Sequence, residues 1–311
     1  MNKLFYITFV VFFGCASSAW ASSSPRVLAS IKPVAMLVKA VVGDEFAVDA
    51  LLSPNTFPHE YALKFSDLKA VKQAELVIWV GPELEGVLVK ALVNVPSDKV
   101  IQLTQLDNIQ WPEVSRERHD HDGHEEHVSH GGKNEESYNR DPHLWLNPQN
   151  SLKVVEAIAV VLATKYPERK TLFETNVREF SEQLTFLDES IQKGFEPVKG
   201  NGFIVVHDGY GHFVEHFGLN QLAAIQLPGG ANRGARHYGE IIALGDRVTC
   251  VFTEPQLNNK LAIQLAKKLA SNHTELDLMG GSTPLSKSSY LEFIRSFAET
   301  FTTCLERSQA K

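Results

Sequence analysis

The sequence lacks a membrane-spanning apolar run, an excess of basic residues and the short motifs of hydrolases. Beyond the N-terminal segment, no stretch approaches the roughly 18 apolar residues that a membrane span needs. Acidic residues outnumber basic ones and the net charge is −7, which argues against nucleic acid as a partner. The motif HExxH is absent because Leu63 stands where the second histidine would be, and no GxSxG occurs. A zinc hydrolase is therefore a weak alternative, although Glu60 or Asp208 could serve as its general base.

The N-terminus has the features of a secretory signal peptide. Lys3 precedes an apolar run that ends at Cys15, and small residues then lead to Ala21. We expect residues 1–21 to be removed and the mature chain to begin near Ser22 in the periplasm. The segment contains one of the 30 basic residues and none of the 37 acidic ones, so the mature charge is 29 minus 37, or −8. A lipid anchor on Cys15 is the alternative, but the residues before it match a lipobox poorly.

Two cysteines, Cys250 and Cys304, remain in the mature chain. An even pair in an oxidising compartment predicts a disulfide, with two free buried thiols as the alternative. The bond would join a strand-like segment to the C-terminal helix and close a loop of about 55 residues, which stabilises a fold by about 2 to 4 kcal/mol.

Apolar patterning predicts two α/β lobes. Short Val- and Ile-rich runs alternate with amphipathic helical stretches on both sides of a helical middle, which favours doubly wound parallel sheets. A stretch of about 25 residues, 171–194, predicts a rigid linking helix of nearly 40 Å. The expected divisions are an N-terminal lobe at 22–148, a helical segment at 149–200 and a C-terminal lobe at 201–311.

Between residues 113 and 140 the periodicity disappears, and histidines alternate with acidic residues: His119, His121, His124, His127 and His130. This tract has almost no apolar residues and cannot build a core. We therefore expect it to be a disordered insertion. Exposed imidazoles bind transition metals weakly, so metal collection is one interpretation and a solvated tract with no essential role is the other. The tract resembles the HxHxDH signature of metallo-β-lactamases, but Gly123 occupies the aspartate position and no strand precedes it.

Three histidines outside this tract are candidate metal ligands. His59 follows a predicted strand and a turn, His143 lies in a proline-bounded apolar strip, and His207 ends a buried strand. Ligands bind α/β sheets at the carboxyl ends of strands, which is where His59 and His207 are expected. The remaining histidines are interpreted as structural: His212, His216, His237 and His273. Two of them, His212 and His216, are one helical turn apart and could hold a stray metal.

The order of several motifs resembles that of the zinc-specific, ZnuA-like solute-binding proteins of ABC transporters. The motifs are Pro58-His59-Glu60-Tyr61, Val77 to Glu85, the histidine-rich tract, Asp141-Pro142-His143-Leu144-Trp145-Leu146-Asn147-Pro148, His207-Asp208-Gly209-Tyr210-Gly211, and Cys250 to Gln256. The resemblance covers nearly the whole mature chain. It implies a monomeric periplasmic protein, not an enzyme, that binds Zn²⁺ between two lobes and delivers it to a membrane permease driven by a cytoplasmic ATPase.

The resemblance also implies a ligand set. His59, His143 and His207 match the three histidine ligands of the family, and Cys250 with Cys304 matches its disulfide. The fourth ligand is Asp277 or water. Glu60 is the weaker candidate, because neighbouring side chains on an extended segment point to opposite sides, so Glu60 would point away from the ion that His59 binds. Some relatives of this fold have adhesive roles, so a surface metal-binding adhesin is the second interpretation.

Overall fold

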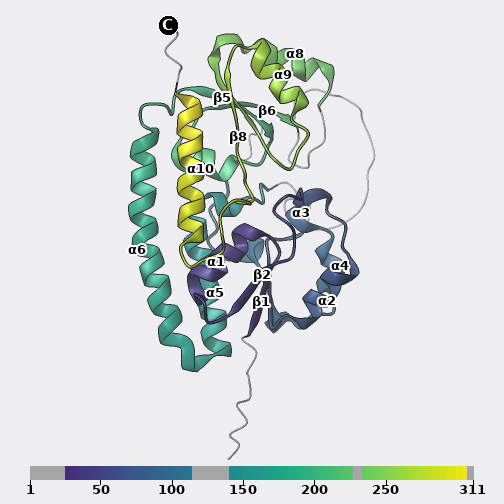
Figure 1. The fold of residues 1–311 in the computed structure, drawn as a ribbon, viewed down its shortest axis with the longest axis vertical. Coiled ribbons are helices and arrows are strands. Elements are labelled where there is room, and N and C mark those ends of the chain that lie inside the picture. The colour runs from purple at the N-terminus through teal and green to yellow at the C-terminus, as the bar shows by residue number, and fades with distance from the viewer. Residues whose placement is uncertain (1–24, 114–139, 227–232, 307–311) are drawn as a thin grey trace, which may run out of the picture.

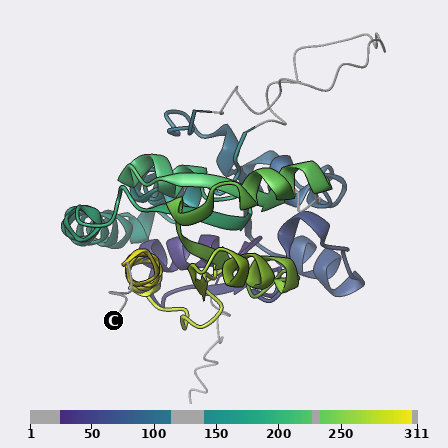
Figure 2. The same cartoon turned by 90° about the horizontal axis from the view of Figure 1, so that it is seen from above.

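The computed structural model describes residues 25–113, 140–226 and 233–306. The predicted signal peptide and the histidines from His119 to His130 lie outside these ranges. The described chain forms two α/β lobes connected by helices that run along one side of the molecule (Figures 1 and 2).

The first lobe is built on a four-stranded parallel sheet with the order β2-β1-β3-β4. Its elements are β1 (Arg26–Ala29), α1 (Lys32–Val42), β2 (Ala47–Ala50), α2 (Phe65–Gln73), β3 (Leu76–Trp79), α3 (Pro82–Glu85), α4 (Leu88–Leu92) and β4 (Val100–Gln102). The apolar pattern predicts most of these elements, but it predicts one helix from Glu83 to Leu92 where the structure has α3 and α4. Gly86 lies at the break, where the missing side chain weakens helix propensity. Strand β4 was not predicted, because three residues are too few to show a period.

The second lobe repeats this architecture with the strand order β6-β5-β7-β8, again with all neighbours parallel. Its elements are β5 (Gly202–His207), α7 (Gly211–Phe217), β6 (Gln221–Gln226), α8 (Ala235–Ile242), β7 (Val248–Thr253), α9 (Lys260–Lys268), β8 (Asn272–Glu275) and α10 (Ser289–Leu305). Every residue of the central strands β5 and β7 is buried, as strands covered on both faces require. The prediction of two doubly wound lobes is confirmed.

Two long helices join the lobes: α5 (Pro148–Lys165) and α6 (Lys170–Phe195). Helix α5 begins where Pro148 fixes the first helical position and the Asn147 side chain accepts hydrogen bonds from the backbone N–H groups of Gln149 and Asn150. Helix α6 lies along one side of the molecule, next to α10 (Figure 1). Its 26 residues agree with the predicted linking helix.

The largest apolar cluster of the described residues runs through both lobes, and each lobe has a smaller cluster of its own. The largest cluster contains side chains from β1 and α1 of the first lobe, from α5 and α6, and from β5, β7 and α10 of the second. Polar contacts add to it: the Trp145 indole N–H donates to the Leu278 carbonyl oxygen, and the Tyr290 hydroxyl donates to the Trp145 carbonyl oxygen. Because the lobes share a close-packed core, moving one lobe against the other would disrupt packing throughout the connection.

The predicted disulfide is present between Cys250 in β7 and Cys304 in α10, with their Cα atoms 5.8 Å apart. It attaches the last helix to the centre of the second sheet. Among the described residues, no helix is both long and apolar enough to cross a membrane.

Candidate metal centre

The fold brings together three histidines that are far apart in the sequence. His59 lies in a short 3₁₀ turn after β2, His143 directly precedes the turn Leu144–Leu146, and His207 is the last residue of β5. One ring nitrogen from each lies within 4.8 Å of the others. The side chains of His143 and His207 are buried, whereas His59 is half-buried and lies on the side closest to solvent.

The spacing of the rings suits a small ion. The ring centroids are 5.0 Å apart for His143 and His207, 5.5 Å for His59 and His143, and 6.2 Å for His59 and His207. A tetrahedral Zn²⁺ with Zn–N bonds of about 2.05 Å needs nitrogens about 3.3 Å apart. Side-chain rotations that move the ring nitrogens by about an ångström would therefore bring all three within bonding distance of one ion.

Two ring nitrogens of these histidines have no hydrogen-bond partner. The Nε2 atoms of His59 and His207 are both buried and unpaired. A buried polar atom without a partner costs free energy, and most such atoms in proteins are paired with protein groups or with water. Two orphaned nitrogens in one cluster are the feature that a bound cation would explain.

Two of the three rings form a hydrogen bond to a carboxylate through Nδ1. Asp141 Oδ1 lies 2.6 Å from His143 Nδ1, and Glu254 Oε1 lies 2.5 Å from His207 Nδ1. Glu254 Oε1 also accepts a hydrogen bond from the Tyr210 hydroxyl at 3.0 Å. Such a carboxylate fixes the proton on Nδ1, which leaves the Nε2 lone pair for a metal and makes the ring more basic.

Asp141 and Glu254 were not predicted to have a role at this site. Asp141 was visible only as the neighbour of a candidate ligand, two residues before it. Glu254 follows β7, which pairs with β5, so its position at the same carboxyl edge as His207 could have indicated it.

The environments of the rings shift their titration in opposite directions. Burial, with help from the neighbouring His143 and His207, lowers the pKa of His59 from 6.5 to about 3. Burial also acts to lower the pKa of His207, but the Glu254 carboxylate outweighs it and the pKa is raised above 6.5. His59 is thus neutral and able to bind a metal at neutral pH, whereas protons compete with a metal for His207 more strongly than they do for a free imidazole.

The predicted fourth ligand, Asp277, does not belong to the histidine cluster. Its carboxylate accepts hydrogen bonds from Gln256 Nε2 at 2.9 Å and from the backbone N–H groups of Met279 and Gly281 at 3.0 and 2.6 Å. Gln256 Nε2 also donates to the Pro54 carbonyl oxygen, so this network connects the second lobe to the loop that leads to His59. Glu60 is exposed and likewise lies outside the cluster.

The other histidines have different surroundings. His212 is buried, with Nε2 2.9 Å from the Asp141 carbonyl oxygen and Nδ1 3.3 Å from the Asn150 amide nitrogen. Both ring nitrogens are engaged, which agrees with a structural role. His216 instead pairs with Asp188 on the neighbouring helix α6.

The family model of the zinc-uptake complex component A, periplasmic (ZnuA), matches residues 27–304. The chain belongs to the ZnuA family. It is 31% identical over 293 residues to the high-affinity zinc uptake system protein ZnuA of Yersinia pestis, a match that covers 91% of this chain and 92% of that protein. The ZnuA family consists of zinc-uptake binding proteins and not of enzymes.

Solved structures of the same fold are similar over most of the chain. A crystal structure of ZnuA has a TM-score of 0.75 at 22% identity and covers 91% of this chain and all of that one. The laminin-binding protein Lmb of Streptococcus agalactiae, described as having adhesin and metal-transporting activity, has a TM-score of 0.74 at 21% identity and covers 91% of this chain and all of that one. At such identities these likenesses establish the fold alone.

Proposed function

We propose that the protein captures Zn²⁺ in the periplasm with His59, His143 and His207 and delivers it to an ABC-type importer. One observation carries the binding step: each of the three histidines has a ring nitrogen within 4.8 Å of the others, and Nε2 of His59 and of His207 is buried without a partner. Membership of the ZnuA family supports zinc as the ion and uptake as the purpose.

The donor set favours zinc over harder ions. Three imidazole nitrogens suit a borderline-soft cation, whereas manganese and magnesium prefer carboxylate and water oxygens. Copper(II) binds such sites with high intrinsic affinity, so discrimination against it depends on geometry and on metal supply. The carboxylates behind His143 and His207 do not compete for the ion, because their oxygens bond to the opposite ring nitrogens.

Water takes the fourth coordination position in this proposal. Asp277 lies outside the cluster of histidine nitrogens, and its carboxylate already accepts hydrogen bonds from Gln256 and from two backbone N–H groups. Replacing Asp277 by alanine should therefore change zinc affinity by less than about threefold, well below the tenfold or greater change that removal of an inner ligand or its orienting partner causes. A loss of more than tenfold would identify Asp277 as the fourth ligand.

Delivery follows from the placement of the ligands on both lobes. His59 and His143 belong to the first lobe, and His207 belongs to the second. A permease that pulled the lobes apart would separate His207 from the other two ligands and release the ion. The shared core and the long helix α6 restrict such motion in the free protein, so the site stays assembled until the protein docks.

The binding step is tested by isothermal titration of the metal-free mature protein with zinc. Wild type should show one tight site, and His143→Ala should lose it while weaker binding elsewhere survives. His237→Ala is a matched control, because His237 is half-buried in the second lobe and its Nε2 is bonded to the Ala224 carbonyl oxygen. Tight binding that survived His143→Ala would overturn the proposed ligand set.

A further inference from the structure

Two ring nitrogens of the three-histidine cluster are shielded from solvent. Nε2 of His59 and Nε2 of His207 are both buried, so a hydrated ion cannot reach them unless part of the protein moves. Separation of whole lobes is restricted, because the largest apolar cluster runs through both of them. A smaller moving part must therefore admit and release the ion in the free protein.

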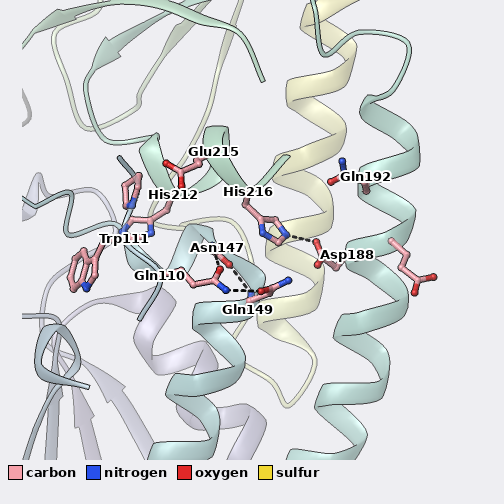
Figure 3. A pocket seen from close by; sticks show the side chains of 11 residues that line it. Gln110, Trp111, Asn147, Gln149, Asp188, Gln192, His212, Glu215 and His216 are labelled. Carbon is pink, nitrogen blue, oxygen red and sulfur yellow. Dashed lines mark hydrogen bonds and ion pairs between the residues drawn. The ribbon is translucent and has the colours of Figure 1, made fainter. Parts of the chain in front are cut away.

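Two of the three candidate ligands are fixed in the fold. His207 ends the central strand β5 and is 1% exposed, and His143 is 3% exposed. The turn after His143 leads into α5 through an amide network, in which Asn147 donates to Gln110 Oε1 at 3.3 Å and Gln110 Nε2 donates to Gln149 Oε1 at 2.9 Å (Figure 3). Moving either ring would disturb a central strand or this network.

His59 is held less firmly. It lies in residues 53–60, here called the His59 loop, and most of these residues are exposed or half-buried. Phe57 of the same loop packs against two of the ligands, with its ring centroid 5.1 Å from that of His59 and 5.5 Å from that of His207. Opening of the loop would therefore move Phe57 and His59 away from His207 together, without moving either lobe.

A hydrogen bond from the second lobe holds the His59 loop in place. Gln256 Nε2 donates to the Pro54 carbonyl oxygen at 2.7 Å. The same nitrogen donates to Asp277 Oδ1 at 2.9 Å, and the Asp277 carboxylate is itself fixed by the backbone N–H groups of Met279 and Gly281. Asp277 thus orients the amide that reaches across to the loop.

We propose that Gln256 is a positioning residue for zinc exchange: its bond to Pro54 keeps the His59 loop closed, and zinc enters and leaves when the bond breaks and the loop opens. This inference rests on the proposed three-histidine site. Neither Gln256 nor Pro54 is a ligand, so the bond stabilises the closed loop whether or not an ion is bound. It therefore slows entry and release by the same factor and leaves the equilibrium affinity unchanged.

The test compares zinc exchange in the full mature chain with and without this bond. Gln256→Met keeps the length of the side chain and its lack of charge but removes the donor. Lys32→Met is the matched control, because Lys32 Nζ also donates across the lobes, to the Gly281 carbonyl oxygen at 2.7 Å, but it attaches α1 and not the His59 loop.

Release is measured by stopped-flow mixing of protein that carries one equivalent of zinc with excess chromophoric chelator. Entry is measured by mixing metal-free protein with zinc, and Kd is measured separately by competition at equilibrium. We expect Gln256→Met to raise the rate constants of entry and release equally, by about two- to tenfold, the effect of losing one net hydrogen bond. Its Kd should match that of wild type, which also shows that the variant is folded. The control should release zinc at the wild-type rate.

Three results would overturn the proposal. Gln256→Met could exchange zinc at wild-type rates, or only its release could become faster, so that affinity falls. Lys32→Met could accelerate release as much as Gln256→Met does, which would mean that whole lobes separate. An absence of tight zinc binding in wild type would instead refute the three-histidine site itself.

Discussion

Replacing Glu254 by glutamine isolates the contribution of the carboxylate that orients His207. The substitution preserves the size of the side chain and an oxygen for the Tyr210 hydroxyl, but it removes the negative charge 2.5 Å from His207 Nδ1. Removal of such an orienting partner lowers metal affinity by about 10- to 100-fold, or about 1.4 to 2.7 kcal/mol. We expect a loss in this range at neutral pH.

The charge of Glu254 also sets how strongly protons compete with zinc. In wild type the carboxylate raises the pKa of His207, so lowering the pH through that raised pKa protonates the ring and weakens zinc binding. Without the carboxylate the pKa falls, so the protonation begins at lower pH. The variant should therefore bind zinc more weakly near pH 7.5 but show a shallower decline in affinity as the solution is acidified.

Competition with a chromophoric zinc chelator, measured across a pH series, gives both quantities. Glu240→Gln is a suitable control, because Glu240 is a half-exposed acid that pairs with the exposed Arg236 and lies outside the cluster. A purely structural role for Glu254 would lower affinity equally at every pH. An orienting role for Glu254 is refuted if the affinity of Glu254→Gln stays within about threefold of wild type, below the range for an orienting carboxylate. It is also refuted if the pH profile of the variant is parallel to that of wild type.

Three further predictions concern the rest of the chain. Zinc affinity of the wild type should fall as the pH drops through the raised pKa of His207, while His59, with a pKa of about 3, stays neutral; equal Kd values at pH 7.5 and pH 5 would contradict a three-histidine site. Deleting residues 117–139 should remove weak zinc binding and leave the tight site in a calorimetric titration, and loss of the tight site would show that the two are not separate. Replacing Cys250 and Cys304 by serine should lower the free energy of unfolding by about 2 to 4 kcal/mol in urea titrations, and an unchanged midpoint would show that the bond constrains little.

The sequence determined the architecture because its signals are local. Alternating apolar runs and amphipathic stretches define the strands and helices, and a buried central strand such as β5 reads as a continuous apolar segment. The histidines at the ends of such strands could be predicted as candidates for the same reason. The disulfide followed from counting the cysteines in a chain that was expected to be secreted, without any knowledge of their distance.

Where the signals are short or depend on packing, the sequence was insufficient. Strand β4 is too short for a period, and the division between α3 and α4 occurs at a single glycine within one helical pattern. The strand-end position of Asp277 gave no indication that its oxygens would be taken by Gln256 and two backbone N–H groups. The bond from Gln256 joins positions 21 residues apart, and no sequence period reveals a contact at that separation.

The sequence alone thus determined two α/β lobes, a long connecting helix and the three histidines as candidates. Only the tertiary structure decided that nitrogens from residues 59, 143 and 207 lie within 4.8 Å of one another. It also decided that the carboxylates of Glu254 and Asp141 bond to Nδ1 of His207 and His143. It also decided that His212 is fully hydrogen-bonded while His216 faces a cavity. The physical reason is that a metal site depends on distances and orientations between side chains, and these are fixed only when the lobes pack on their common core.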